Sequence, residues 1–352
     1  MKTRVYITID TECREERVDA NGNLTPSAGY ESRVWGRFGH DTRALGIPLI
    51  MDTLEASGLR GVFFVDPFGA YSFGMDGLRG VCKHILSRGH DVQLHAHPRQ
   101  RTANWRTQGK PPLPDRMHEY PQERQHELLE EGIELLVQAG TPRERIVAFR
   151  AGHFAANDDT LSAMATAGLR ISSNFNPCYL KNGECRISAP IHAGPLFRTT
   201  AGIWELPISN IRNGSDYRHL QITALSSAEI TGYLRRAHAA GVSDVVIVTH
   251  SFEHYYLHTG HPPRGRINAV NAQRLQTVCR FLARHTDQFT VSDMPSLART
   301  LRDTDQTEAE SKAFTPTLRW DLRIRRNFEQ LLKRFDSKNK LPRFLLPDAG
   351  LR

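Results

Sequence analysis

Short apolar runs rich in β-branched residues alternate along this chain with longer segments of helical periodicity, and this alternation limits the fold more than any other feature. Eight runs fit strands, at residues 5–9, 61–65, 91–94, 146–149, 169–172, 203–206, 245–249 and 289–291. Six segments fit helices, at residues 42–56, 78–88, 122–139, 160–167, 228–240 and 272–285. Strands that alternate with helices indicate a parallel sheet, because each parallel crossover needs a helix-length connection. We therefore predict an α/β fold, with its sheet closed as a barrel or open and doubly wound.

Two long polar segments interrupt the alternation, and each directly follows a predicted strand. Residues 14–40 come after the first strand, and residues 98–121 come after the third. Because the carboxyl ends of parallel strands carry the active site in α/β folds, we expect both segments to line a substrate-binding site. Residues 301–317 are polar and acidic and are predicted to be a linker. We accordingly divide the chain into a barrel (1–300), this linker and a basic tail (318–352).

The tail is predicted to form a basic amphipathic helix. Residues 318–340 hold eight Lys or Arg against three Asp or Glu, which is most of the formal net charge of +8. Apolar residues recur there at three- and four-residue steps, at Ile324, Phe328, Leu331, Leu332 and Phe335. Such a helix packs on the barrel or on a second subunit of a homo-oligomer, or it docks reversibly on an anionic membrane. The rest of the chain is nearly balanced in charge, which argues against a nucleic-acid partner.

The start of the chain and its cysteines indicate the compartment. The segment from Met1 to Arg4 runs straight into the first strand, which leaves no room for a signal peptide, and no later stretch is apolar enough to span a bilayer. The five cysteines are odd in number and show no CxxC spacing, so neither a disulfide framework nor a zinc knuckle is indicated. We therefore expect a cytoplasmic protein with reduced thiols.

Ionisable residues stand at the ends of four predicted strands. They are Asp10 and Glu12 after the first strand, His95 and His97 after the third, Arg150 after the fourth and His250 after the seventh. Each alone has an ordinary explanation as a cap, a surface residue or half of an ion pair. Together, carboxylates and imidazoles at one edge of a sheet suit a divalent cation such as zinc, with an open position for water. This pattern is typical of a metal-dependent hydrolase.

Five short motifs follow one another along the chain: ITIDTE, RGHDVQLHAHP, FRAGHF with the later GLRISSN, WELP, and VIVTHS. In this order, over roughly residues 4–295, they resemble the motifs of the polysaccharide deacetylases with a NodB-homology domain, carbohydrate esterase family four. The DVQLHxHP wording is most similar to a cytoplasmic WbmS-like branch associated with bacterial surface-polysaccharide clusters. The resemblance implies a distorted (β/α) barrel of about seven parallel strands, here with a C-terminal helical extension. It also implies N-deacetylation of an amino sugar.

The resemblance implies which residues hold the metal. The family's adjacent pair of aspartates is here Asp10-Thr11-Glu12, which moves the metal carboxylate to Glu12. The family's two metal histidines are four residues apart, whereas here His97 follows His95 by two. We therefore expect Glu12, His95 and His97 to bind one divalent metal, with zinc as the preferred identity.

The same resemblance implies catalytic roles. It makes Asp10 the base that deprotonates the attacking water and Arg150 the residue that orients this base. It makes His250 the acid that protonates the departing nitrogen, and we expect Glu205 to orient the His250 ring. The substrate is then a small-molecule or glycan amide.

Three alternatives stay open. One is an amidohydrolase-type barrel, in which an HxH pair also binds metal but normally comes from the first barrel strand. The second is a cyclic-amide hydrolase built on the deacetylase fold. The third, from another functional class, is a catalytically inactive carbohydrate-binding relative that kept the cleft and lost the metal.

Overall fold

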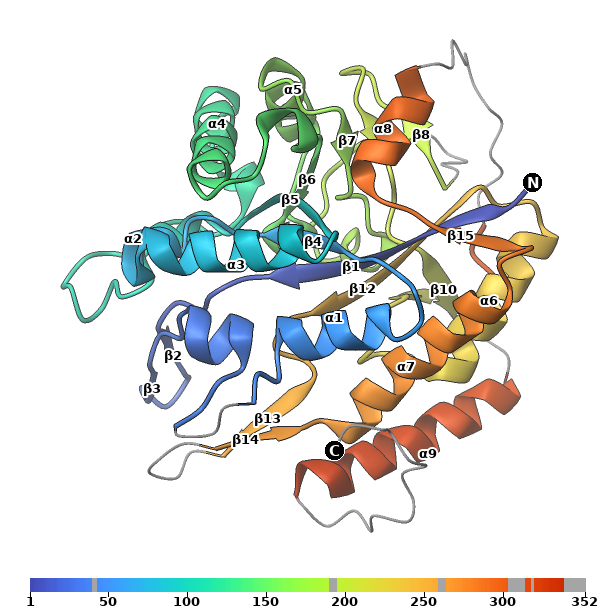
Figure 1. Cartoon of the computed structure of the whole chain (residues 1–352). Helices are drawn as coiled ribbons and strands as arrows, with labels where there is room; N and C mark the ends of the chain where they lie inside the picture. Colours follow the sequence, from blue (N-terminus) through green and yellow to red (C-terminus); the bar gives the residue numbers. More distant parts are fainter. Residues whose placement is uncertain (40–42, 190–194, 259–263, 303–313, 318–319, 339–352) are drawn as a thin grey trace.

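The computed structural model describes residues 1–39, 43–189, 195–258, 264–302, 314–317 and 320–338. A curved sheet runs through the molecule with helices packed around it (Figure 1). Seven strands are parallel neighbours in the order β12 (Asp244–His250), β1 (Thr3–Thr11), β4 (Val62–Val65), β5 (Asp91–Ala96), β6 (Ala148–Ala151), β7 (Ile171–Ser172) and β9 (Trp204–Glu205). At one edge β8 (Phe197–Arg198) pairs antiparallel with β9, while β15 (Phe289–Val291) pairs parallel with β1. This half-closed barrel confirms the predicted α/β fold.

Six helices confirm the helical periodicity of the sequence. They are α1 (Ile47–Glu55), α3 (Met75–Ser87), α4 (Gln122–Gln138), α5 (Asp158–Thr166), α6 (Ser227–Ala239) and α7 (Ala269–Arg284). Helix α1 begins five residues after the predicted position 42, because Gly46 and Pro48 fix its start at Ile47. Two short helices, α2 (Ala70–Phe73) and α8 (Met294–Arg302), were not predicted.

The first strand shows how the sheet orients the site. Val5, Ile7 and Ile9 of β1 belong to the larger apolar core, whereas Tyr6 belongs to a second core. Since successive side chains of a strand point to opposite faces, Asp10 lies on the Tyr6 side of β1. Most of β1 is buried on both faces, as expected for a central parallel strand.

Among the described residues, three short hairpins lie outside the main sheet. Strands β2 (Arg17–Val18) and β3 (Leu24–Thr25) pair within the first polar insertion. Strands β10 (Asn210–Asn213) and β11 (Asp216–His219) form a second hairpin, and β13 (Tyr255–His258) and β14 (Arg264–Ile267) form a third. None of these hairpins was predicted, because strands of two to four partly exposed residues carry little periodicity.

The predicted tail helix is present as α9 (Trp320–Ser337), which lies against α6 and α7 (Figure 1). Of the predicted linker, residues 303–313 lie outside the described residues, so the three-part domain division stays a prediction.

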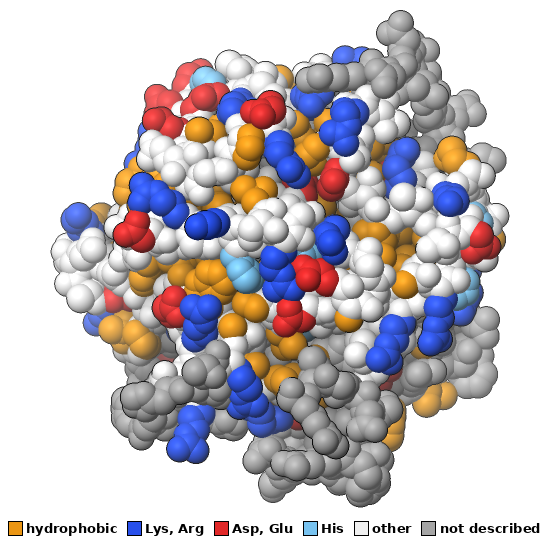
Figure 2. Space-filling model, viewed as in Figure 1, with side chains coloured by type: hydrophobic (Ala, Val, Ile, Leu, Met, Phe, Trp, Pro, Cys, Tyr) orange, Lys and Arg blue, Asp and Glu red, His pale blue; other side chains and the backbone are white. Residues whose placement is uncertain are grey.

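None of the described helices combines the length and the apolar character that a membrane span needs. All five cysteines are free thiols, as expected. On the face of the molecule seen in Figure 2, which is viewed as in Figure 1, Lys and Arg side chains are spread over the surface with Asp and Glu side chains between them.

Candidate active site

The register of the sheet brings the predicted residues to one edge. Asp10 stands opposite His250 across the β1–β12 pair, and His95 stands opposite Arg150 across the β5–β6 pair. All of these positions lie at or near the carboxyl ends of parallel strands. The residues that the sequence analysis assigned to one site therefore come from neighbouring strands.

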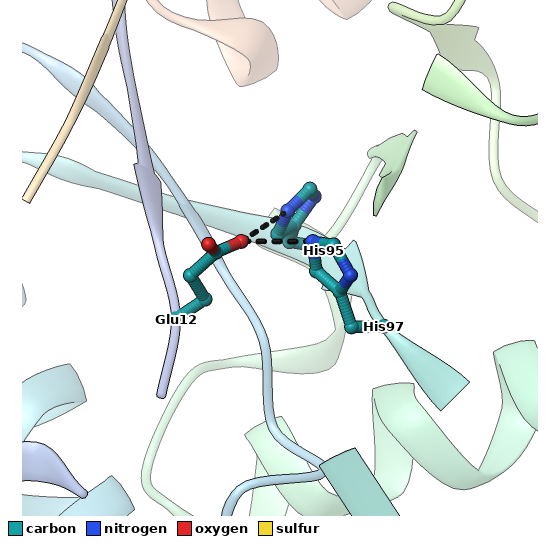
Figure 3. Close-up of side chains that lie close together, drawn as sticks. All are labelled: Glu12, His95 and His97. Carbon is teal, nitrogen blue, oxygen red and sulfur yellow. Dashed lines mark hydrogen bonds and ion pairs between the residues drawn. The ribbon is translucent and has the colours of Figure 1, made fainter. Parts of the chain in front are cut away.

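Glu12, His95 and His97 converge on one point (Figure 3). The Oε2 atom of Glu12 lies 2.8 Å from Nε2 of His97 and 3.3 Å from Nε2 of His95. A ligand atom from each of the three buried residues lies within 4.8 Å of the others. One carboxylate and two imidazoles are a common donor set for zinc and other divalent metals, so the residues present fit the predicted metal.

In each histidine of this group, the other ring nitrogen, Nδ1, is held by an oxygen atom. Nδ1 of His95 lies 2.7 Å from the backbone oxygen of Arg150, and Nδ1 of His97 lies 3.1 Å from Oδ2 of Asp115. Because an oxygen acceptor at Nδ1 keeps the proton there, Nε2 of each ring is left free to bind a metal. The ring of His97 also packs on Gly152, where a Cβ atom would lie 2.4 Å from Cε1 of His97.

Asp115 joins His97 to an additional histidine. Nε2 of His153 lies 3.1 Å from the same Oδ2 atom of Asp115, which makes His97, Asp115 and His153 a second group that could hold a metal. His153 adopts a left-handed backbone conformation with φ of 58°, which is uncommon for a residue other than glycine. We assign Asp115 to orientation of His97, because Nε2 of His97 already faces Glu12.

The charges of His97 and of the two carboxylates beside it, Glu12 and Asp115, favour one another. Burial disfavours the ionised form of Glu12, but the His97 and His95 imidazoles outweigh burial and hold the pKa of Glu12 well below its usual range. Burial likewise opposes the charged form of His97, yet Glu12 and Asp115 hold its pKa well above its usual range. The carboxylates thus favour a positive charge between them, which a proton on His97 or a divalent cation can supply.

Asp10 is fixed by a buried arginine. Nη1 of Arg150 donates to Oδ1 of Asp10 at 2.6 Å and to Oγ1 of Thr8 at 3.0 Å. Nη2 of Arg150 donates to the hydroxyl of Ser173 at 3.0 Å. The Arg150 side chain has no exposed surface, so this network holds the Asp10 carboxylate in one orientation. The contact matches the predicted pairing of Arg150 with Asp10.

His250 faces the free oxygen of Asp10. Nε2 of His250 lies 3.8 Å from Oδ2 of Asp10, and its Nδ1 lies 2.9 Å from Oε1 of Glu253. Burial opposes the charged imidazole, but Glu253, with a smaller contribution from Asp10, raises the pKa of His250 to about 9. Glu253 itself has its pKa lowered to about 2, since His250 outweighs the effect of burial. The carboxylate of Glu253 therefore favours the charged form of His250.

The prediction that Glu205 orients the His250 ring is wrong, because Nδ1 of His250 contacts Glu253 instead. Glu205 instead accepts hydrogen bonds from the backbone nitrogens of Asn174 and Phe175, both at 2.9 Å. It is fully buried, and this burial raises its pKa to about 7. Glu205 thus fixes the loop that follows β7, and this loop supplies the Ser173 contact to Arg150.

Sequence reasoning missed three acidic residues at this site. Asp66 directly follows β4, is 2 % exposed, and has one carboxylate oxygen without a hydrogen-bond partner in the described structure. The strand-end rule that selected Asp10 would have found Asp66. Glu253 lies three residues after His250, within reach of the ring if the chain turns there. Asp115 carries no signal, because it lies within an irregular polar loop.

A cleft of about 540 Å³ is lined in part by Asp115, the residue that contacts Nδ1 of His97. Residues 15–18 line it from the first polar insertion, Arg99, Trp105 and Asp115 line it from the second, and His153 joins them. Nε1 of Trp105 donates to the backbone oxygen of Glu16 at 3.1 Å, which ties the two insertions together. Both insertions thus border a cleft, as the sequence predicted, and its use by a substrate stays a prediction.

No family model matches the chain, and no curated protein matches it in sequence. Among solved structures, the chain is similar to a protein from Parabacteroides distasonis named as a glycoside hydrolase/deacetylase. The identity is 9 %, with 88 % of this chain and 74 % of that chain covered and a TM-score of 0.54.

Two further similarities have lower scores. A protein from Mycobacterium smegmatis named as a polysaccharide deacetylase is 18 % identical, with 78 % of this chain and 80 % of that chain covered and a TM-score of 0.46. The α-amylase AmyC from Thermotoga maritima is 7 % identical, with 100 % of this chain and 84 % of that chain covered and a TM-score of 0.49. The comparisons therefore show that this chain shares the fold of the Parabacteroides distasonis protein.

Proposed function

We propose that the chain is a metal-dependent hydrolase of amide carbon–nitrogen bonds that removes the acetyl group from an amino sugar in bacterial surface-polysaccharide metabolism. The observation that carries this proposal is the convergence of Glu12, His95 and His97 beside the facing pair of Asp10 and His250. The five motifs support placement in the polysaccharide deacetylase family and its WbmS-like branch. The name of the Parabacteroides distasonis protein is consistent with this placement. A cytoplasmic location stays a prediction.

The metal would be held by Glu12, His95 and His97, with zinc as our preferred identity. A bound divalent cation would supply Lewis acidity and lower the pKa of a coordinated water molecule. The protein's contribution is to present the Oε2 atom of Glu12 and the two Nε2 atoms together. The backbone oxygen of Arg150 and the carboxylate of Asp115 keep both rings turned toward Glu12.

Asp10 and His250 would move the protons. Oδ1 of Asp10 is occupied by Arg150, which leaves Oδ2 as the atom that accepts the proton of the attacking water. Glu253 favours the charged form of His250, which would carry its transferable proton on Nε2, on the side that faces Asp10. His250 would donate this proton to the departing nitrogen, while Glu253 holds Nδ1. A base and an acid 3.8 Å apart would thus carry out the two proton transfers of one hydrolysis, from the attacking water and to the departing nitrogen.

The cleft beside His153 would bind the sugar. Its lining combines an indole ring, Trp105, with charged side chains such as Arg99 and Glu15. Sugars present an apolar face that packs on aromatic rings and hydroxyl groups that bond to charged groups. A cleft of about 540 Å³ is within the size range of small-molecule sites, roughly 300–1,000 Å³.

The proposal is tested by metal analysis of the purified protein together with substrate profiling. We expect about one divalent ion per chain and release of acetate from N-acetylated sugars, offered free, nucleotide-linked or lipid-linked. Ring opening of cyclic ureides without acetate release would move the function to a cyclic-amide hydrolase. A protein that binds sugar but holds no metal and releases no product would be an inactive carbohydrate-binding relative.

A further inference from the structure

Helix α9 turns its apolar side outward. The exposed fractions of Ile324, Phe328, Leu331 and Phe335 are 61, 56, 47 and 44 %. Their spacing of four, three and four residues places them on one narrow face of the helix. We call these four residues the outer stripe. A helix that packed on the barrel in the usual way would bury this face.

Polar residues anchor the opposite side of α9 to the barrel. Three ion pairs do so: Arg326 with Glu229 at 3.3 Å, Glu329 with Arg274 at 2.8 Å, and Asp336 with Arg266 at 2.6 Å. Arg326 and Asp336 are 7 % and 2 % exposed. Since pairing of this kind depends on geometry, the three contacts fix the rotation of the helix about its axis. The outward direction of the outer stripe follows from them.

Among the described side chains of α9, the charge left on the outer side of the helix is positive. Glu329 and Asp336 are neutralised by arginines of the barrel, whereas Arg334 and Lys338 are exposed. Among the residues described, neither Arg334 nor Lys338 has a carboxylate within ion-pair distance. The exposed surface of α9 thus combines bulky apolar side chains with unpaired cations.

We propose that this surface docks on an anionic membrane, with the outer stripe in the interfacial layer and Arg334 and Lys338 among the phosphate groups. An outward apolar face with cations beside it is the arrangement found in helices that lie in the membrane interface. Cations near an anionic bilayer surface each favour binding. The proposal concerns where the protein acts and does not depend on its hydrolytic activity.

Charge complementarity favours lipid over a second copy of the chain. Both described carboxylates of α9, Glu329 and Asp336, are already paired with arginines of the barrel, so a second copy that docked through the outer stripe would offer Arg334 and Lys338 no free carboxylate from this helix. The stripe also offers a small contact. The 18 residues of α9 span about 27 Å, and four half-exposed side chains along one line fall short of the roughly 800 Å² per partner of a stable interface.

The test must leave α9 in place, because its last turn supports the site. Oδ2 of Asp336 accepts a hydrogen bond from the backbone nitrogen of Ala269 at the start of α7. The preceding residue, Asn268, donates to the backbone oxygen of Glu253, which is the partner of His250. Removal of the helix would therefore disturb the site as well as the surface, whereas substitution of exposed side chains would not.

The experiment measures sedimentation of the full-length protein with vesicles of phosphatidylcholine and phosphatidylserine in equal parts, and with vesicles of phosphatidylcholine alone. We expect binding to the mixed vesicles, weakened by salt. The double variant Phe328→Ser/Leu331→Ser should bind at least roughly tenfold more weakly, and Arg334→Gln/Lys338→Gln should lose the preference for phosphatidylserine. Val137→Ser, at another exposed apolar site, serves as the control and should bind like the unmodified protein.

Two outcomes would overturn the proposal. One is that the vesicle assay finds no binding through the outer stripe, either because the full-length protein fails to sediment with mixed vesicles at low salt or because Val137→Ser weakens binding as much as the stripe variant does. The other is that the unmodified protein is a dimer by analytical ultracentrifugation and that Phe328→Ser/Leu331→Ser makes it a monomer. That result would assign the stripe to a subunit interface. Circular dichroism of each variant confirms that α9 and the barrel remain folded.

Discussion

The Nδ1 atom of His97 lies 3.1 Å from the Oδ2 atom of Asp115. Strand β5 ends at Ala96, so the ring of His97 is not held by the sheet alone. Asp115 comes from the second polar insertion and turns Nε2 of His97 toward Glu12. The insertion therefore borders the cleft and also supplies a residue that orients His97 in the candidate metal site.

Replacing Asp115 with alanine should weaken metal binding by a factor of about 10 to 100, the usual cost of losing a carboxylate behind a ligand histidine. Competition with a chelator measures this directly and needs no substrate. Glu123→Gln, an exposed carboxylate at the start of α4, is the control and should leave affinity unchanged. An unchanged affinity for Asp115→Ala would remove Asp115 from the metal site.

His95→Ala and His153→Ala together decide which of the two candidate groups binds the metal. His95 belongs only to the group with Glu12, and His153 only to the group with Asp115. We expect His95→Ala to lose the ion, because two remaining ligands are too few for a tight site, and His153→Ala to keep it. Elemental analysis of the purified variants gives the answer. Full occupancy in His95→Ala would refute the assignment.

Gly152→Ala should displace His97 without removing any ionisable group. The new Cβ atom would lie 2.4 Å from Cε1 of His97, closer than two carbon atoms can approach. We expect metal affinity to fall and the free energy of unfolding to drop by about 1–3 kcal/mol, the cost of an overpacked core position. Gly80→Ala is the matched control, since its nearest neighbour would be at 3.8 Å. If both variants keep the same metal affinity and stability, the contact between Gly152 and His97 does not position the His97 ring.

Much of the fold could be predicted because its signal is local. The apolar run that includes Val5 and Ile9 and the helical period of residues 122–139 are each visible within one segment. The site residues at strand ends could be predicted because parallel strands bring their carboxyl ends together. The partner of His250 could not, since both Glu205 and Glu253 are acidic and only the turn after β12 decides which one reaches the ring. Asp115 depends on an irregular loop and has no pattern at all.

Asp10→Asn should abolish turnover while the protein keeps its metal. An amide cannot accept the proton of the attacking water, yet Asp10 is absent from both candidate metal groups. The substitution also leaves the fully buried Arg150 without its carboxylate, so we expect a loss of stability of up to about 3–5 kcal/mol. Thermal unfolding and elemental analysis of the same preparation separate the two effects. Near-normal turnover would show that another group is the base.

The alkaline limit of activity should depend on Glu253 and not on Glu205. The pKa of His250 is raised to about 9, and since the acid acts in its protonated form, activity should fall as the pH rises through this value. Glu253→Gln removes the negative charge 2.9 Å from Nδ1, which lowers the pKa of His250. The fall in kcat/KM should then begin at lower pH, by roughly one unit or more. Glu205→Gln, which contacts the loop after β7, should leave the limit in place. His250→Ala should lower the rate by a factor of about 100 or more and lose this limb of the profile. A profile that moves with Glu205→Gln and not with Glu253→Gln would reverse the assignment of the orienting carboxylate.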